Sequence, residues 1–410
     1  MSKNNCKHQS RRSKYSQKIN NIYEILRIMN NNLMTDKLKI SVNSDETQLV
    51  FKVLLSNDKI GTARLPLKLD CNDGSSLPSI SLPKPIIGIN YEPSPSNYNS
   101  LPPPAIYYDT DFSNVDFRGL WSPTDNNSNV PGRDDINVIN QMHFNVVKMY
   151  NWNPLRNHKS FLDYCDSNNI KVIVPISNYF IENFSTQQDN ILKIINQANH
   201  PAVIAFAIGN EIDISFAPVI ANIVKLVNGI RLCCAPVKIT DFPSIPQAIF
   251  QAYGDTMSNF SRVFFQAVNV YPPPNDAVNQ ATVNLNKMIN QKWPSSIFHS
   301  QPLLISEYGW NSSVSEIDQS NSIQKQITFI KQSAMDPSKP LFLGGILFEF
   351  TDELWKPDQG NGFDGQDYGL FKLSDKFTIG TTVGNLQFPI NVLIPKPIVT
   401  FFGDIVIKFK

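Results

Sequence analysis

The segment Val203-Ile-Ala-Phe-Ala-Ile-Gly-Asn-Glu211 decides the fold class of this chain. An uninterrupted apolar run ends there at a polar Asn-Glu pair, and Pro302-Leu-Leu-Ile-Ser-Glu-Tyr-Gly309 repeats the pattern. Short continuous apolar runs are typical of strands buried on both faces, as in a parallel sheet that helices cover. Each of the two glutamates therefore comes at the end of a buried strand.

Eight such runs occur between residues 84 and 373, and the segments between them have helical periodicity. The runs are Ile86–Tyr91, Asn145–Tyr150, Lys171–Ile176, Val203–Ile208, Pro236–Thr240, Phe264–Val270, Pro302–Ser306 and Phe342–Phe348. After the first interval they begin 26 to 40 residues apart, which suits one strand, one helix and two short loops. Eight repeats favour an α/β fold of the closed (β/α)8 TIM-barrel type over an open doubly wound sheet. A Pro-, Ser- and Asn-rich insertion at residues 93–131 lengthens the first interval, and we expect it over the barrel mouth.

The sequence divides into four regions. We expect residues 1–34 to be a basic, polar, disordered tail, and residues 35–83 to be a strand-rich N-terminal extension and linker. Residues 84–375 form the expected catalytic barrel, and residues 376–410 a strand-rich C-terminal extension. Whether the two extensions pair into one small sheet is left open. The N-terminal stretch lacks the apolar core of a secretory signal, so we expect a cytoplasmic protein or a non-classical export route.

Composition excludes several classes of function. The 36 Lys and Arg nearly balance the 35 Asp and Glu, so a net charge of +1 gives no support for nucleic-acid binding. The apolar runs fall far short of the ~20 residues of a membrane span. The five cysteines, at positions 6, 71, 165, 233 and 234, include no C-x-x-C pair, so we expect no structural zinc and no disulfide framework. We expect no metal and no cofactor, and the oligomeric state is left undetermined.

Carboxylates, amides and aromatic rings gather at the expected strand ends, where the active sites of such barrels lie. No nucleophilic serine motif, phosphate-binding loop or dinucleotide fingerprint accompanies them. Sugar chemistry uses this set of residues, because paired carboxylates cleave glycosidic bonds. Glu211 and Glu307 follow the fourth and seventh strands, on opposite sides of the mouth, as the two carboxylates of a retaining glycosidase require. Either glutamate alone would equally suit a helix N-terminus.

Several motifs resemble those of glycoside hydrolase clan A. The segments Gly88-Ile-Asn-Tyr-Glu-Pro93, Arg133-Asp134, Asn145-Val-Val-Lys-Met-Tyr150 and Ser306-Glu-Tyr-Gly309 are similar to family 72 glucanosyltransferases. The segments Phe348-Glu-Phe-Thr-Asp-Glu-Leu-Trp-Lys356 and Tyr368-Gly-Leu-Phe371 resemble family 17 glucanases. Both families act on β-1,3-glucans. The resemblance covers residues 84–373 and leaves both termini unexplained.

The resemblance implies a role for individual residues. Glu211 would be the acid/base and Glu307 the nucleophile, with Tyr271 bonding the Glu307 carboxylate. Asn210 would bond the sugar 2-hydroxyl. The remaining implied substrate contacts are Tyr91, Tyr150, Asn151, Trp152, Tyr179, Trp310 and Trp355. Clan members often carry Arg where this chain has Lys148, which keeps the charge but loses the bidentate fork.

The resulting prediction is a retaining β-glycoside hydrolase or transglycosylase that acts on a β-1,3-linked glucan by double displacement. Its partner is then an oligosaccharide or polysaccharide. The mechanism requires a raised pKa for Glu211, which we expect the Glu307 charge to supply. Two alternatives remain open: a clan A hydrolase of a mannan or galactan, and a non-catalytic glycan-binding protein on the same fold.

Overall fold

A computed structural model describes residues 82–97, 111–127, 129–227, 229–273, 278–353, 366–383 and 385–407, together with the backbone of three strands nearer the N-terminus. The chain divides into two units, Met1–Leu77 and Pro78–Lys410. In the first unit, β1 (Leu38–Val42), β2 (Gln48–Leu54) and β3 (Ile60–Pro66) form an antiparallel sheet in that order. The tail expected at residues 1–34 lies outside the described residues.

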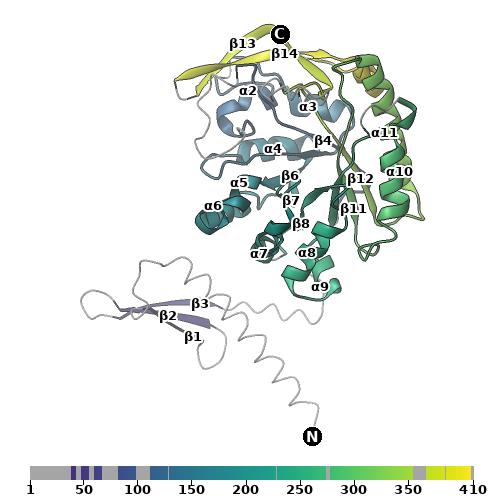
Figure 1. The fold of residues 1–410 in the computed structure, drawn as a ribbon. Coiled ribbons are helices and arrows are strands. Elements are labelled where there is room, and N and C mark those ends of the chain that lie inside the picture. The colour runs from purple at the N-terminus through teal and green to yellow at the C-terminus, as the bar shows by residue number, and fades with distance from the viewer. Residues whose placement is uncertain are drawn as a thin grey trace. The chain divides into compact units, whose positions relative to one another are not determined.

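The second unit is a (β/α)8 barrel, which confirms the expected fold class (Figure 1). Its strands are β4 (Ile86–Asn90), β5 (Val146–Lys148), β6 (Lys171–Ile176), β7 (Val203–Ile208), β8 (Leu232–Cys234), β9 (Pro236–Lys238), β10 (Gln266–Asn269), β11 (Leu303–Tyr308) and β12 (Phe342–Leu347). They pair in parallel in the order β8-β7-β6-β5-β4-β12-β11-β10-β9. All eight strand positions contribute to one buried apolar cluster, which includes Ile86, Val146, Cys234 and Leu304.

The fifth barrel strand is broken into β8 and β9 at Ala235. The sequence predicted this strand at Pro236–Thr240, so the prediction missed the half that pairs with β7. Pro236 has no N–H to donate, which suits it to an interrupted position in a ladder. The barrel still closes, because β9 pairs with β10 and Cys233 bridges to Phe264.

Helices surround the strands as the apolar periodicity predicts (Figure 1). They are α4 (Lys159–Ser167), α5 (Asn178–Glu182), α6 (Phe184–Gln197), α7 (Ala217–Val227), α8 (Ser244–Tyr253), α9 (Met257–Ser261), α10 (Val283–Lys287) and α11 (Glu316–Met335), with short turns η4 (Ile214–Phe216), η5 (Val278–Gln280) and η6 (Met288–Lys292). In α6 the buried side chains are Ile191, Ile194 and Ile195, which lie on one face at helical spacing. Packing of such stripes against the strands makes the outer layer of the core.

The segment between β4 and β5 carries η3 (Val115–Phe117), α2 (Arg118–Trp121) and α3 (Asp135–Gln141). Its buried Phe112, Phe117 and Leu120 pack against Phe388 and Ile390 of the C-terminal hairpin. That hairpin consists of β13 (Phe371–Val383) and β14 (Leu386–Pro395), which run past α2 and α3 in Figure 1. β13 and β14 pair with each other in antiparallel fashion.

The last described segment takes the place of an eighth helix. In η7 (Pro397–Phe402), Ile398 and Val399 are buried in the main core beside α11. The ring of Phe402 packs on Phe144, and Val406 bonds the Gln141 side chain. This segment therefore covers the barrel between α11 and α3.

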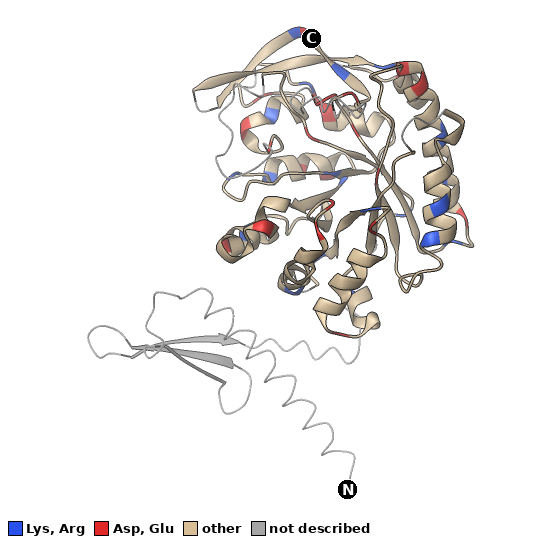
Figure 2. Cartoon of the chain, in the orientation of Figure 1, with Lys and Arg blue, Asp and Glu red and all other residues tan. Residues whose placement is uncertain are grey.

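Charged side chains of both signs are interspersed over the described part of the barrel (Figure 2). Within the described residues, none of the helices combines the length and the apolar character that a bilayer crossing demands.

Candidate active site

Glu211 stands on a left-handed turn at the C-terminal end of β7. Gly209 has a φ of 69° and Glu211 a φ of 54°. The positive φ at Gly209 favours glycine, and a Cβ there would also lie 2.8 Å from Cδ1 of Ile181. For a residue with a Cβ the left-handed region is unfavourable by about 1–2 kcal/mol. Such strain persists only where the surrounding structure imposes it, and it concentrates at functional sites.

Two sets of hydrogen bonds impose this conformation. The side chain of Asn178 accepts from the Asn210 N–H at 2.7 Å and donates to the Asn210 carbonyl at 3.0 Å. The N–H of Glu211 donates to the carbonyl of Pro236 at 2.9 Å. The turn is thus tied to the start of α5 on one side and to β9 on the other.

Glu307 lies within β11 and is only 4% exposed. Its Oε1 accepts from Lys148 Nζ at 2.9 Å and from the Tyr150 hydroxyl at 2.6 Å. Its Oε2 accepts from the Tyr271 hydroxyl at 2.9 Å. The Lys148 ammonium also lies 4.2 Å from the centroid of the Tyr150 ring. The lysine at this position therefore makes a buried ion pair with Glu307, in which a single ammonium takes the place of a guanidinium fork.

The two glutamates have opposite pKa shifts. Burial raises the pKa of Glu307, but the Lys148 charge and the Tyr150 and Tyr271 hydroxyls outweigh it and hold the pKa below its ordinary value. The pKa of Glu211 is raised, chiefly by burial, against a hydrogen bond from Asn269. The charge of Glu307 also raises this pKa, as expected, but burial is the larger cause.

A cleft of about 450 Å³ opens beside Asn210. The ends of β5, β6 and β7 line it with Tyr150, Asn151, Ser177, Asn178, Tyr179, Glu182 and Asn210, among others. A second cleft of about 360 Å³ is lined by Glu211 together with Ile212, Asp213, Ile214, Thr240, Asp241, Ser244 and Ile245. Glu211 thus borders one cleft, and the neighbouring Asn210 borders the other.

Aromatic rings pack around the Glu307 carboxylate. Phe348, which follows β12, makes edge contacts with the rings of Tyr150 and Tyr271, at centroid distances of 6.1 and 6.3 Å. Tyr368 packs edge-on against Tyr271 at 5.8 Å. These rings limit the access of water to Glu307, which strengthens its interaction with Lys148.

Tyr91 does not belong to the site. It is fully buried, its hydroxyl donates to Asp135 at 3.0 Å, and its ring packs on Phe161 and Phe350. Arg133 completes this buried group through its ion pair with Asp135. The expectation of a substrate contact at Tyr91 is corrected by this burial, because its ring and hydroxyl are both occupied inside the core.

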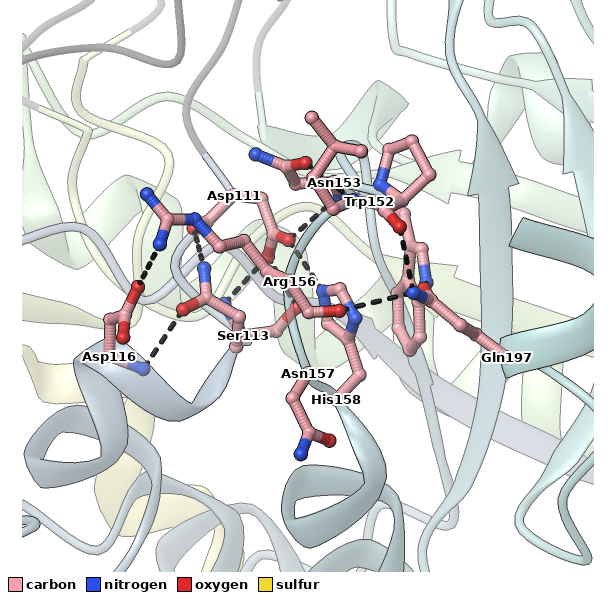
Figure 3. Close-up of polar contacts among 12 residues, drawn as sticks. Asp111, Ser113, Asp116, Trp152, Asn153, Arg156, Asn157, His158 and Gln197 are labelled. Carbon is pink, nitrogen blue, oxygen red and sulfur yellow. Dashed lines mark hydrogen bonds and ion pairs between the residues drawn. The ribbon is translucent and has the colours of Figure 1, made fainter. Parts of the chain in front are cut away.

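Trp152 is likewise a structural residue. It is 1% exposed, and its ring stacks on His158 at 3.8 Å, as Figure 3 shows. Its Nε1 donates to Gln197, while His158 bonds the buried Asp111 at 2.6 Å. The network fastens the loop after β5 to the inserted segment. Since both faces of the indole are enclosed, the expected stacking on a sugar at Trp152 is corrected.

The remaining expected contacts differ in their placement. Tyr150, Asn151, Tyr179 and Asn210 line the first cleft. Trp310 is partly buried against the main core, and its carbonyl accepts from Gln319. Trp355 lies outside the described residues.

Sequence reasoning missed Asn269, which joins the two halves of the site. It lies inside the sixth barrel strand, and its amide reaches both Asn210 and Glu211. The available signal was its position two residues before Tyr271, because residues at that spacing project to the same side of a strand. Among the described residues no three His, Cys, Asp or Glu side chains gather as metal ligands would.

No family model and no curated protein sequence matches this chain. Structural similarity extends to Saccharomyces cerevisiae Gas2p in complex with laminaripentaose, at 12% identity and a TM-score of 0.46, over 77% of this chain and 63% of that one. A plant beta-glucan endohydrolase has 16% identity and a TM-score of 0.47, over 70% of this chain and 96% of that one. Bacteroides uniformis beta-glucuronidase 2 has 14% identity and a TM-score of 0.45, over 79% of this chain and 37% of that one. The chain thus spans less than two thirds of the length of Gas2p and of the glucuronidase.

Proposed function

We propose that the protein is a retaining β-glycoside hydrolase or transglycosylase that acts on a β-1,3-linked glucan. The observation that carries the proposal is the pair of glutamates at the ends of β7 and β11 with opposed pKa shifts. A retaining glycosidase needs one ionised carboxylate as nucleophile and one protonated carboxyl as acid. Environments that push two such pKa values apart assign those roles, Glu307 to the first and Glu211 to the second.

The reaction proceeds in two steps. A carboxylate oxygen of Glu307 forms a bond to the anomeric carbon. At the same time the bond between that carbon and the leaving oxygen breaks, and the leaving oxygen takes the proton of Glu211. The Glu307 charge is consumed in the ester, so the pKa of Glu211 falls and its carboxylate can act as base. Glu211 then takes a proton from the acceptor, whose oxygen displaces Glu307. The acceptor is water in a hydrolase and a sugar hydroxyl in a transglycosylase.

The cleft beside Asn210 supports a carbohydrate substrate. The first cleft offers tyrosine rings at Tyr150 and Tyr179, and amides at Asn151 and Asn178. Rings pack on the apolar faces of sugars, and amides can donate to and accept from hydroxyl groups. The β-1,3 linkage in the proposal comes from the sequence motifs around Gly88 and Phe348.

The test is incubation with β-1,3-gluco-oligosaccharides, with product lengths read by mass spectrometry and anomeric configuration by NMR. Glu307→Gln and Glu211→Gln are compared with Glu316→Gln, a matched control at the start of α11 that pairs with Lys372. We expect β-configured products from the wild type and the control. The Glu307→Gln variant should lose at least about 10⁴-fold in rate, since nucleophile and acid act as a unit.

Product lengths separate the two forms of the proposal. Shorter products alone indicate a hydrolase, and products longer than the starting sugar indicate a transglycosylase. Products of α configuration, or full activity in Glu307→Gln, would contradict the retaining mechanism. Binding without turnover would favour the glycan-binding alternative, and turnover of mannan or galactan alone would change the substrate class.

A further inference from the structure

Asn269 is a buried amide with a defined orientation. It ends β10 and is 2% exposed. Its Oδ1 accepts from the Ser306 hydroxyl at 2.7 Å. Its Nδ2 donates to Oδ1 of Asn210 at 3.2 Å and to Oε1 of Glu211 at 3.0 Å. Both the oxygen and the nitrogen of the amide are therefore hydrogen-bonded. A reversed amide would turn its carbonyl oxygen toward two acceptors.

Backbone pairing explains how Ser306 reaches this amide. The register of β10 against β11 shifts at this point, because Val268 pairs with Ile305 while Asn269 pairs with Glu307. Ser306 is the extra residue in β11, and bulges of this kind re-aim side chains next to active sites. The same irregularity thus presents Glu307 at the mouth and directs the Ser306 hydroxyl toward Asn269.

The two oxygens of Glu211 have different surroundings. Oε1 accepts from Asn269, whereas Oε2 lies 3.5 Å from Nζ of Lys238, whose side chain is 57% exposed. A protonated carboxyl accepts better through its carbonyl oxygen than through its hydroxyl oxygen. A fixed N–H facing Oε1 therefore favours the protonated form in which Oε2 carries the hydrogen.

We propose that Asn269, held by Ser306, is a positioning residue that reserves Oε1 of Glu211 as an acceptor and leaves Oε2 to deliver the proton to the leaving oxygen. The inference rests on the proposed function and adds to it the oxygen that transfers the proton. The charged or titratable groups that act on Glu211 within the described structure are Glu307 from β11, Lys238 from β9 and the Tyr271 hydroxyl after β10.

Donors with different leaving groups test this inference. A methylphenyl β-laminaribioside needs a proton on its leaving oxygen, whereas a dinitrophenyl β-laminaribioside does not. For Asn269→Ala we expect kcat/KM to fall roughly 10–100-fold on the methylphenyl donor, the range for one lost hydrogen bond to a charged group, and to change little on the dinitrophenyl donor. The basic limb of the pH profile should move to higher pH, because the carboxylate loses a donor.

Two further variants complete the design. Ser306→Ala frees the amide to rotate, so it should show the same donor selectivity with a smaller loss, and it carries the test if Asn269→Ala does not fold. Gln266→Leu removes a buried amide at the other end of β10, which bonds Gln301, and should affect both donors equally. Equal losses on both donors in Asn269→Ala and Ser306→Ala, with an unmoved basic limb, would overturn the inference. A wild type that cleaves neither donor would overturn the proposed function itself.

Discussion

Replacement of Lys148 by methionine tests how the ionised state of Glu307 is maintained. The ammonium lies 2.9 Å from Oε1, and the two side chains are 2% and 6% exposed. Removing one partner of a buried ion pair destabilises a protein by about 3–5 kcal/mol, because the other charge stays buried without compensation. We expect Lys148→Met to lower the free energy of unfolding by that amount near pH 7.

The loss of stability in Lys148→Met should depend on pH, and the direction of that dependence follows from the pKa shift of Glu307. In the wild type this pKa lies below its ordinary value, so the stabilisation is complete above the unfolded pKa and disappears as pH falls through the folded value. Without Lys148, burial remains as the largest influence and the folded pKa rises above the unfolded one. The variant then loses stability as pH rises through that interval. The difference in the free energy of unfolding between the two proteins should therefore be smaller near pH 4 than near pH 7.

Urea unfolding at both pH values measures this difference for Lys148→Met, Lys148→Arg and the double variant Lys148→Met/Glu307→Gln. Arginine keeps the charge, so Lys148→Arg should retain most of the stability. The double variant should recover much of the loss, because it leaves no unpaired charge. An equal loss at pH 4 and pH 7, or no recovery in the double variant, would refute the electrostatic explanation and leave lost packing as the cause.

Further predictions concern the two glutamates and the core. The profile of kcat/KM against pH should be bell-shaped: it should rise through the pKa of Glu307, below the ordinary glutamate value, and fall through the pKa of Glu211, above that value. The Glu211→Gln variant identifies the limb that belongs to Glu211. If that limb is the acidic one, the assigned roles are contradicted. Glu211→Gly should be about 0.5–1 kcal/mol more stable than Glu211→Ala in thermal unfolding, because glycine relieves the left-handed strain but loses more entropy on folding. Tyr91→Phe should lower stability by about 1–3 kcal/mol, since it removes a buried donor to Asp135, and should leave kcat/KM unchanged. A large fall in kcat/KM at unchanged stability would instead make Tyr91 a substrate contact.

The barrel could be predicted from sequence because its strands are buried on both faces. Runs such as Val203–Ile208 are apolar at every position, and their spacing leaves room for one helix each. The ends of such runs identify which residues follow each strand, so Glu211 and Glu307 could be placed at strand ends without any knowledge of contacts. The break at Ala235 could not be found in this way, because β8 and β9 are each three residues long and too short to give a pattern.

Burial of individual aromatic residues could not be predicted either. Tyr91 and Trp152 follow strands just as Tyr150 does, and nothing in the local sequence distinguishes them. The Tyr91 hydroxyl is hydrogen-bonded to Asp135, and the Trp152 ring is stacked on His158. Both partners come from other parts of the chain. The orientation of a side chain after a strand depends on those partners.

The sequence by itself determined the order of strands and helices and the residues at each strand end, since these follow from local periodicity. The tertiary structure alone decided which side chains meet. Lys148 is 159 residues from Glu307, and Asn269 is 58 residues from Glu211. These pairs come within hydrogen-bond distance only when the barrel closes, and the opposed pKa values of the two glutamates arise from that closure, because burial and charge act over a few ångströms of space rather than along the chain.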